Sequence, residues 1–165
     1  MEWNEDLERI ALQERELQLP RLDAEIAWEL GSSLRTMAAE RRLAIVIDVR
    51  RFGQPLFYAA MDGTTPDNVE WVRRKSNVVA RFHRSSYAVG LKERTKNESL
   101  LKSQGLPIAD YATHGGSFPL AVAGAGVIGS ATVSGLPERG DHELVIEALC
   151  AILKHDYEQL KLSAE

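Results

Sequence analysis

The chain has 165 residues, of which 44% are hydrophobic, and a formal net charge of −4. This length and apolar content are typical of one compact domain. The acidic balance argues against a nucleic-acid-binding surface, which normally carries a basic stripe on a basic background. Cys150 is the only cysteine, which excludes an intrachain disulfide and a cysteine-based zinc site. The acidic N-terminal residues lead into no apolar stretch, so we expect no secretory signal, no membrane span and a cytoplasmic location.

The N-terminal part of the chain predicts two helices. Residues 7–19 form a charged amphipathic segment that Pro20 stops, and we expect it to pack at an edge or on a neighbouring subunit. Asp23 is a suitable N-cap for a long second helix, because apolar residues recur around and after it at spacings of three and four. These apolar residues are Leu22, Ile26, Leu30, Leu34, Met37 and Ala38. We therefore divide the chain into an N-terminal helical segment, 1–19, and a single domain over 20–165.

The middle of the chain predicts a strand pair followed by helices. Residues 44–49 and 55–61 are strand-like runs on either side of a turn. A second long helix is expected over residues 67–84, and shorter helical pieces, broken at Gly90, over 87–104. One face of the 67–84 helix carries Arg73, Arg74, Arg81 and Arg84. Such a face holds carboxylates or phosphate, or is simply a solvated or subunit-facing surface.

A glycine-rich segment then predicts a second hairpin. Residues 118–123 and 127–134 read as antiparallel strands joined by a tight turn, with Gly129 where another chain element approaches too closely for a side chain. Asp141 is interpreted as the cap of a last helix that runs to about Tyr157. The order of elements predicts an α/β (α+β) fold, an α/β/α sandwich around an antiparallel sheet.

Four short motifs resemble those of the haem-degrading-domain family, which includes HbpS-like haem-binding proteins, GlcG-like proteins and the C-terminal haem-binding module of PduO. They are residues 83–86 (HRSS), 111–119 (YATHGGSFP), 134–137 (SGLP) and 141–142 (DH). The resemblance covers residues 20–157 and is greatest to an intracellular branch of the family. It implies a profilin-like or PAS-like antiparallel sheet of roughly five strands, haem as a cofactor and a closed homo-oligomer.

His114 is the strongest candidate for a site. The glycines Gly115 and Gly116 after it would let a ligand approach the backbone and leave the imidazole projecting into a cavity. Imidazole is a common axial ligand of haem iron, so His114 is also the candidate metal ligand. The alternative is a histidine that only hydrogen-bonds a loop. Tyr111 and Thr113 flank it and would supply an oxygen ligand or a hydrogen bond.

His83 and Arg84 stand where the 67–84 helix ends and are a second pair of candidates for cofactor binding. His83 lies at the edge of the apolar sector of that helix, so it either faces a pocket or caps the last carbonyls. Arg84, with the other arginines of the helix, is suited to haem propionates.

The remaining signals are weaker. Cys150 lies on an apolar helix stripe, where a thiol is usually inert. Residues 124–129 fit Gly-x-Gly-x-x-Gly but lack the helix that this motif must open. The acidic residues spaced by three over 2–8 match an iron motif that arises easily by chance. His142 is expected to be a neutral hydrogen-bonding histidine, and His155 structural or exposed.

Two classes of function remain. The first is an oligomeric protein that binds haem or a related tetrapyrrole and assists its oxidative breakdown. The second is a non-enzymatic oligomeric scaffold or small-molecule-binding module without a metal. The expected partners are a second copy of the chain and a small molecule, with no nucleic acid and no membrane.

Overall fold

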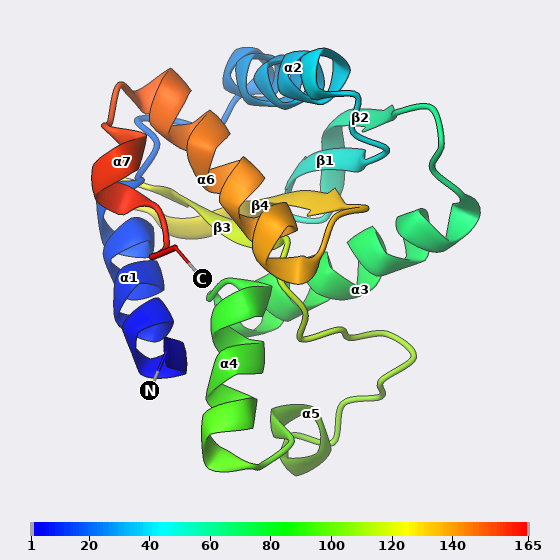
Figure 1. Cartoon of the computed structure of the whole chain (residues 1–165), viewed down its shortest axis with the longest axis vertical. Helices are drawn as coiled ribbons and strands as arrows, with labels where there is room; N and C mark the ends of the chain where they lie inside the picture. Colours follow the sequence, from blue (N-terminus) through cyan, green and yellow to red (C-terminus); the bar gives the residue numbers. More distant parts are fainter. Residues whose placement is uncertain (1, 165) are drawn as a thin grey trace.

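The computed structural model describes residues 2–164, which form an α+β fold with an antiparallel sheet between helices (Figure 1). The strands are β1 (Val46–Arg51), β2 (Gln54–Ala60), β3 (Ser117–Val122) and β4 (Gly126–Ser134). The helices are α1 (Glu2–Glu16), α2 (Ala24–Arg41), α3 (Pro66–Phe82), α4 (Ser86–Lys96), α5 (Leu100–Ser103), α6 (Glu138–Leu153) and α7 (Tyr157–Leu160).

The sheet has the strand order β2-β1-β4-β3, and every neighbouring pair is antiparallel. Both predicted hairpins are confirmed. The expectation of five strands is wrong for the described residues, which contain four. Beyond β3, residues 2–164 supply only a single parallel bridge, between Leu19 and Val122. The segment that enters β3 is a loop, and Arg73 and Arg74 of α3 donate hydrogen bonds to its Ala109 and Ile108 carbonyls.

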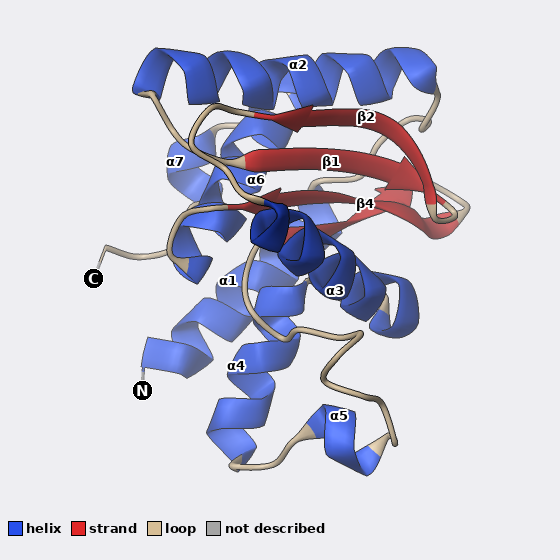
Figure 2. Ribbon diagram, turned by 90° about the vertical axis from the view of Figure 1, so that its right-hand side faces the viewer, coloured by secondary structure: helices blue, strands red, loops and turns tan. Residues whose placement is uncertain are grey.

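The two faces of the sheet are covered by different helices. The helices α2 and α6 pack on one face and α3 packs on the other, which gives the three layers expected from the sequence. Figures 1 and 2 show α2 beside β2, with α4 and α5 at the opposite end of the molecule. On the α2 and α6 side the sheet contributes an apolar core of Ile47, Val49, Phe118, Leu120, Ala131 and Val133.

Residues that alternate with this core face α3, and most of them are polar. Asp48, Ser117, Ser130, Thr132 and Ser134 are all at most 4% exposed. Strand side chains alternate between the two faces, so the same strands build both an apolar and a polar buried surface. Buried polar groups need partners, and the Ser117 and Thr132 hydroxyl oxygens lie 2.8 Å apart in a hydrogen bond.

The N-terminal helix packs on its own chain. Ile10 and Leu17 are at most 1% exposed, and α1 contacts α4 and α7. The Gln13 side chain accepts a hydrogen bond from His142 Nε2 (2.8 Å) and donates one to the Leu160 carbonyl (2.8 Å). Ile10 and Leu17 therefore find their partners within the chain, at the edge of the fold, and do not need the neighbouring subunit that was the other expectation for this segment.

Several local predictions hold and two do not. Asp23 caps α2 by accepting the Ile26 N–H (2.9 Å), and a Cβ on Gly129 would lie 2.2 Å from the Arg50 carbonyl oxygen. Gly90 does not break α4. Because Gly90 has no Cβ, the Thr113 carbonyl oxygen can approach the helix, and a Cβ at this position would lie 1.9 Å from that oxygen. Asp141 does not cap α6, which begins three residues earlier.

No helix among residues 2–164 is both long enough and apolar enough to cross a membrane.

Candidate functional site

A pocket of about 260 Å³ lies where the loop before β3 meets the first half of α3 and the turn that precedes α6. Its lining is mostly polar or charged, in contrast to the core on the other side of the sheet. The lining residues are Asp67, Asn68, Trp71, Lys75, His114, Gly115, Ser134, Gly135, Leu136, Glu138 and Asp141.

His114 is exposed and stands at the wall formed by α3. Its ring meets the Trp71 indole edge to face, with centroids 5.1 Å apart and planes at 77°. Its imidazole has no hydrogen-bond partner among the described residues. Partial burial lowers the pKa of His114, and the nearby cations Arg94, Lys75 and Arg74 add to this against the opposing effect of Glu138. The site thus presents a neutral imidazole at physiological pH.

Trp71 is fixed from two sides. Its indole N–H donates to Asp67 Oδ2 (3.2 Å), one helical turn earlier on α3. The Arg74 guanidinium lies 4.9 Å from the ring centroid, in the geometry of a cation–π contact, and donates to the Ile108 carbonyl (2.7 Å). Arg74 therefore ties the loop before β3 to the aromatic wall of the pocket.

The floor of the pocket contains a buried ion pair. Lys75 Nζ donates to Asp141 Oδ2 (3.1 Å) and to the carbonyls of Gly115 (2.9 Å) and Val133 (2.8 Å), and the two charged side chains are at most 4% exposed. Burial lowers the pKa of Lys75 and raises that of Asp141 to about 6, although each charge partly compensates the other. The other Asp141 oxygen accepts the Leu136 N–H (2.8 Å).

A glycine is required beside this ion pair. Gly116 has a φ of +136°, and a Cβ there would lie 2.4 Å from Lys75 Nζ and from the Val133 carbonyl oxygen. The carbonyl of the same glycine accepts a hydrogen bond from the Val133 N–H (2.9 Å). Gly116 thus lets the backbone reach the lysine, as expected for a position where side chains are excluded.

The loop that carries His114 is also held from the α6 side. Glu138 accepts the Gly115 N–H (3.1 Å) and pairs with both terminal nitrogens of Arg94. Burial favours the protonated form of Glu138, but these hydrogen bonds outweigh burial and lower its pKa. A carboxylate therefore anchors the backbone next to the imidazole.

Comparison with known proteins shows the family to which the chain belongs. The family model for haem degrading protein HbpS-like matches residues 22–150. The chain belongs to the HbpS-like family. A UPF0303 protein from Burkholderia thailandensis is 65% identical over 158 residues, 96% of each chain. Another, from Paraburkholderia phymatum, is 58% identical over 163 residues, 99% of each chain.

Solved structures share the fold of this HbpS-like chain. The crystal structure of Ybr137w has a TM-score of 0.82 at 25% identity, covering 90% of this chain and 88% of that one. HbpS has a TM-score of 0.64 at 21% identity, with 84% and 94% covered. The PduOC:heme complex has a TM-score of 0.68 at 17% identity, with 82% and 99% covered. Of these, only the PduOC structure is described as a haem complex.

The HbpS-like motifs do not all meet at one place. His114 and Gly115 line the pocket, and Gly116 backs its floor. Thr113 turns away, because its hydroxyl donates to Glu93 Oε2 on α4 (2.6 Å). Tyr111 is half-buried and does not line the pocket.

His83 and Arg84 lie at the other end of α3. His83 is its C-cap, with a φ of 56°, and Arg84 pairs with Glu14 on α1 (2.5 Å). Trp71 and His83 are twelve positions apart, which places them about 18 Å apart along the helix axis. The sequence grouped these residues with His114, and the structure separates them.

Three important residues were not recognised in the sequence. Lys75 interrupts the apolar stripe of α3 between Val72 and Val79, and a charge at that spacing is the signal of a buried pair. Asp141 was assigned to a helix cap, and Glu138 to no role. Their partners lie more than 20 residues away, so only the fold brings them together.

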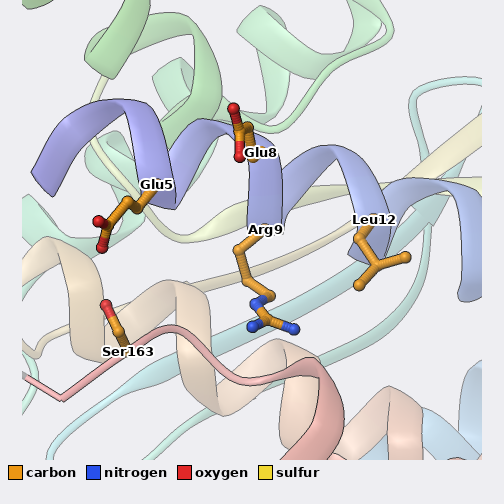
Figure 3. Close-up of a pocket in the computed structure, with 5 residues that line it drawn as sticks. All are labelled: Glu5, Glu8, Arg9, Leu12 and Ser163. Carbon is orange, nitrogen blue, oxygen red and sulfur yellow. The ribbon is translucent and has the colours of Figure 1, made fainter. Parts of the chain in front are cut away.

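Another hollow, of about 430 Å³, lies between α1 and the C-terminal segment (Figure 3). Figure 3 shows Glu5 and Glu8 pointing in different directions from the helix, and Arg9 donates to the Gln159 carbonyl (2.7 Å).

Among residues 2–164, no group of three or more histidine, cysteine or acidic side chains is placed to hold a metal ion. The buried Cys150 is likewise unreactive, because burial raises the pKa of its thiol to about 11.

Proposed function

We propose that this chain binds haem or a related tetrapyrrole at the His114 pocket, where the His114 imidazole would hold the iron. The observation that carries the proposal is an exposed, unpartnered imidazole whose pKa is lowered, so that its nitrogen is available to a metal at neutral pH. Membership of the HbpS-like family and the fold shared with the PduOC:heme complex support the same ligand.

The residues around His114 fit the edge of a haem but do not enclose it. Trp71 offers an aromatic surface, Ile108 is 73% exposed, and Arg74 supplies a cation suited to a propionate. The pocket itself is small and polar, whereas a tetrapyrrole needs broad apolar walls. Most of the macrocycle would therefore lie outside one copy of the chain.

This geometry leads to the second part of the proposal, that the chain self-associates and that a neighbouring copy covers the outer face of the ligand. Large apolar side chains remain exposed, notably Phe52 (80%), Ile108 (73%) and Trp28 (67%). They lie on three separate parts of the chain, the β1–β2 turn, the loop before β3 and α2, so each is a place where another copy could pack. Closed homo-oligomers are the commonest assemblies of soluble chains. Light scattering during size-exclusion chromatography tests this part, and a mass near the 18.3 kDa of one chain would contradict it.

The reaction in the proposal is assistance to haem breakdown. A bound iron would supply redox chemistry, and the chain's own residues would bind and orient the ligand. His114 would hold the iron, and the Glu138 carboxylate would fix the loop that carries it through the Gly115 N–H. Groups that hold a metal-ligating histidine in its orientation are a regular feature of metal sites.

A titration with hemin tests ligand binding. The protein should give a shifted and saturable Soret band, and His114→Ala should abolish the shift. His155→Ala is a matched control, since His155 is exposed and lies outside the pocket. A wild-type spectrum equal to that of free hemin would contradict the proposal, and so would an unchanged band in His114→Ala.

The polar lining favours a second candidate, a binding module for a small polar molecule without a metal. Native mass spectrometry of the purified protein tests it. A bound small molecule that is lost in Trp71→Ala, together with no response to hemin, would favour this module. The absence of both signals would leave the oligomeric scaffold as the better explanation.

A further inference from the structure

A second cavity, of about 290 Å³, lies on the same face of the sheet at the other end of α3. The turn between β1 and β2, the start of β4 and the second half of α3 form its walls. Its lining residues are Arg50, Phe52, Gly53, Ser76, Asn77, Ala80, His83, Val127, Ile128, Gly129 and Ser130. None of these residues lines the His114 pocket.

The walls of this cavity are mainly apolar. Val127 and Ile128 of β4 lie on one side, Ala80 of α3 lies on another, and the 80% exposed Phe52 stands at the turn. No aspartate or glutamate lines the cavity, whereas three, Asp67, Glu138 and Asp141, line the His114 pocket. An apolar cavity with a few polar groups is the usual form of a site for a small organic molecule.

A fixed guanidinium, that of Arg50, lines the cavity. Arg50 donates to both carboxylate oxygens of Asp48, from Nε (2.6 Å) and from Nη2 (2.8 Å). The Asp48 side chain is 1% exposed and that of Arg50 is 22% exposed. This bidentate pair sets the guanidinium plane. Nη1 has no hydrogen-bond partner among the described residues, so its N–H groups remain as donors beside the cavity.

Other polar groups line the same cavity. Ser130 is directly opposite Arg50 in the pairing of β1 with β4, and His83 lies at the rim on the C-cap of α3. The lining thus combines one cation and an imidazole with no acid of its own. This composition favours an anionic group over a cationic one.

We propose that this cavity is a binding site for a small organic acid with a flat apolar body, separate from the His114 pocket. The carboxylate accepts hydrogen bonds from Arg50 Nη1, and the body lies against Val127 and Ile128. The guanidinium needs no rearrangement on binding, because Asp48 already holds it in place. The site does not depend on haem or on a metal.

The test uses 2-naphthoate as the probe and its amide, 2-naphthamide, as the uncharged isostere. Isothermal titration calorimetry on the full chain should show saturable binding of 2-naphthoate and at least about tenfold weaker binding of the amide, since a charge-assisted hydrogen bond is lost. Ala80→Trp should weaken 2-naphthoate at least about tenfold by filling the cavity. Ala80 is exposed on α3, so the larger side chain does not enter the core.

Arg81→Trp is the matched control, because it puts the same side chain on the next exposed position, which does not line the cavity. Its affinity for 2-naphthoate should stay within about twofold of wild type. Ala80→Leu is a smaller block and should show an intermediate loss. Undetectable binding of 2-naphthoate, or equal affinity in wild type and Ala80→Trp, would overturn the site. Equal affinity for acid and amide would overturn the anionic ligand.

The hemin titration separates this site from the proposed function. Ala80→Trp should leave the Soret shift unchanged, and His114→Ala should leave 2-naphthoate binding unchanged. Loss of both ligands in either variant would overturn the independence of the two cavities. Binding of 2-naphthoate with no response to hemin would contradict haem binding and support this site alone.

Discussion

The two faces of the sheet are both buried, but they bury different chemistry. Under α2 and α6 the strands contribute Ile47, Val49 and Val133, and the contacts are those of an ordinary apolar core. Under α3 the alternate positions contribute Asp48, Thr132 and Ser134, and a charged lysine enters from the helix. Both faces bury side chains, yet only the second does so with groups that need specific partners.

This difference indicates that one face of the sheet stabilises the fold and the other positions the candidate site. Apolar burial stabilises the fold without requiring particular chemistry. A buried ion pair adds little net stability compared with a well-packed apolar pair, because both charges lose their hydration. The Lys75–Asp141 pair contributes instead by fixing the backbone at Gly115, next to His114. Both candidate cavities also open on the α3 face.

Lys75→Met should give the largest effect on stability. It leaves the Asp141 carboxylate buried without its cation and removes the donor from the Gly115 and Val133 carbonyls. We expect a loss of about 3–5 kcal/mol in the free energy of unfolding at pH 7.5, measured by urea denaturation. The loss should be smaller at pH 5, because protonation then removes the unpaired charge.

The double variant Lys75→Met, Asp141→Leu is its control. Replacing both charges by apolar groups should recover much of the lost stability, while hemin affinity stays low because the Gly115 carbonyl is no longer held. A double variant that is less stable than Lys75→Met alone would show that the pair stabilises the fold itself, and the contrast between the faces would fail.

The second prediction concerns His142, a polar group on α6 that is fully buried against Tyr87 and Phe118. Burial lowers its pKa from 6.5 to about 3. In the unfolded chain His142 therefore binds a proton below about pH 6.5, whereas in the folded chain it does so only below about pH 3. The stability that the neutral His142 contributes is complete above pH 6.5 and is lost as the pH falls toward 3.

For one proton this loss is about 1.4 kcal/mol per pH unit, or about 2–3 kcal/mol between pH 6.5 and 4.5. His142→Gln keeps a donor for Gln13 and should lack this slope. The comparison is made as the difference between the two proteins, since the raised pKa of Asp141 gives the opposite slope in both. Parallel stability profiles would show that His142 is protonated in the folded protein.

Gly129→Val should have a smaller effect. A Cβ at this position would lie 2.2 Å from the Arg50 carbonyl oxygen and 2.8 Å from Leu22 Cδ2. Because one of these neighbours is backbone, β1 and β4 must shift apart, and we expect a loss of about 1–3 kcal/mol. The melting temperature from circular dichroism measures it. An unchanged melting temperature would show that the strands accommodate the side chain freely.

The sequence predicted most of the fold because the fold depends on local patterns. The three- and four-residue spacing around Asp23 located α2, and the glycine turns located the hairpins. The strand count was wrong, since it came from the resemblance to a family and not from a further strand-like run. Gly90 was misinterpreted for a related reason: its close neighbour, Thr113, is distant in the sequence.

The candidate site was predicted only in part. His114 was visible because two glycines follow it, whereas the role of Lys75 depends on Asp141, 66 positions later. His83 and His114 were grouped because both belong to family-like motifs, but a helix of 17 residues holds them apart. Motifs indicate which residues are chemically useful, and the topology determines which of them share a cavity.

The smallest expected effect comes from Asp23→Ala, on the apolar side of the sheet. Asp23 accepts the Ile26 N–H at the start of α2, and its pKa is lowered first by this hydrogen bond and then by Arg21. Losing a helix cap costs about 1 kcal/mol, within a range of about 0.5–2. Urea denaturation should show this loss, while the Soret band and 2-naphthoate affinity stay unchanged, because α2 lines neither cavity on the α3 face. Asp23→Asn is the matched variant and should retain most of the stability, since asparagine caps nearly as well. A change in either ligand affinity would show that the two faces of the sheet are coupled, and that stability and binding are not divided between them.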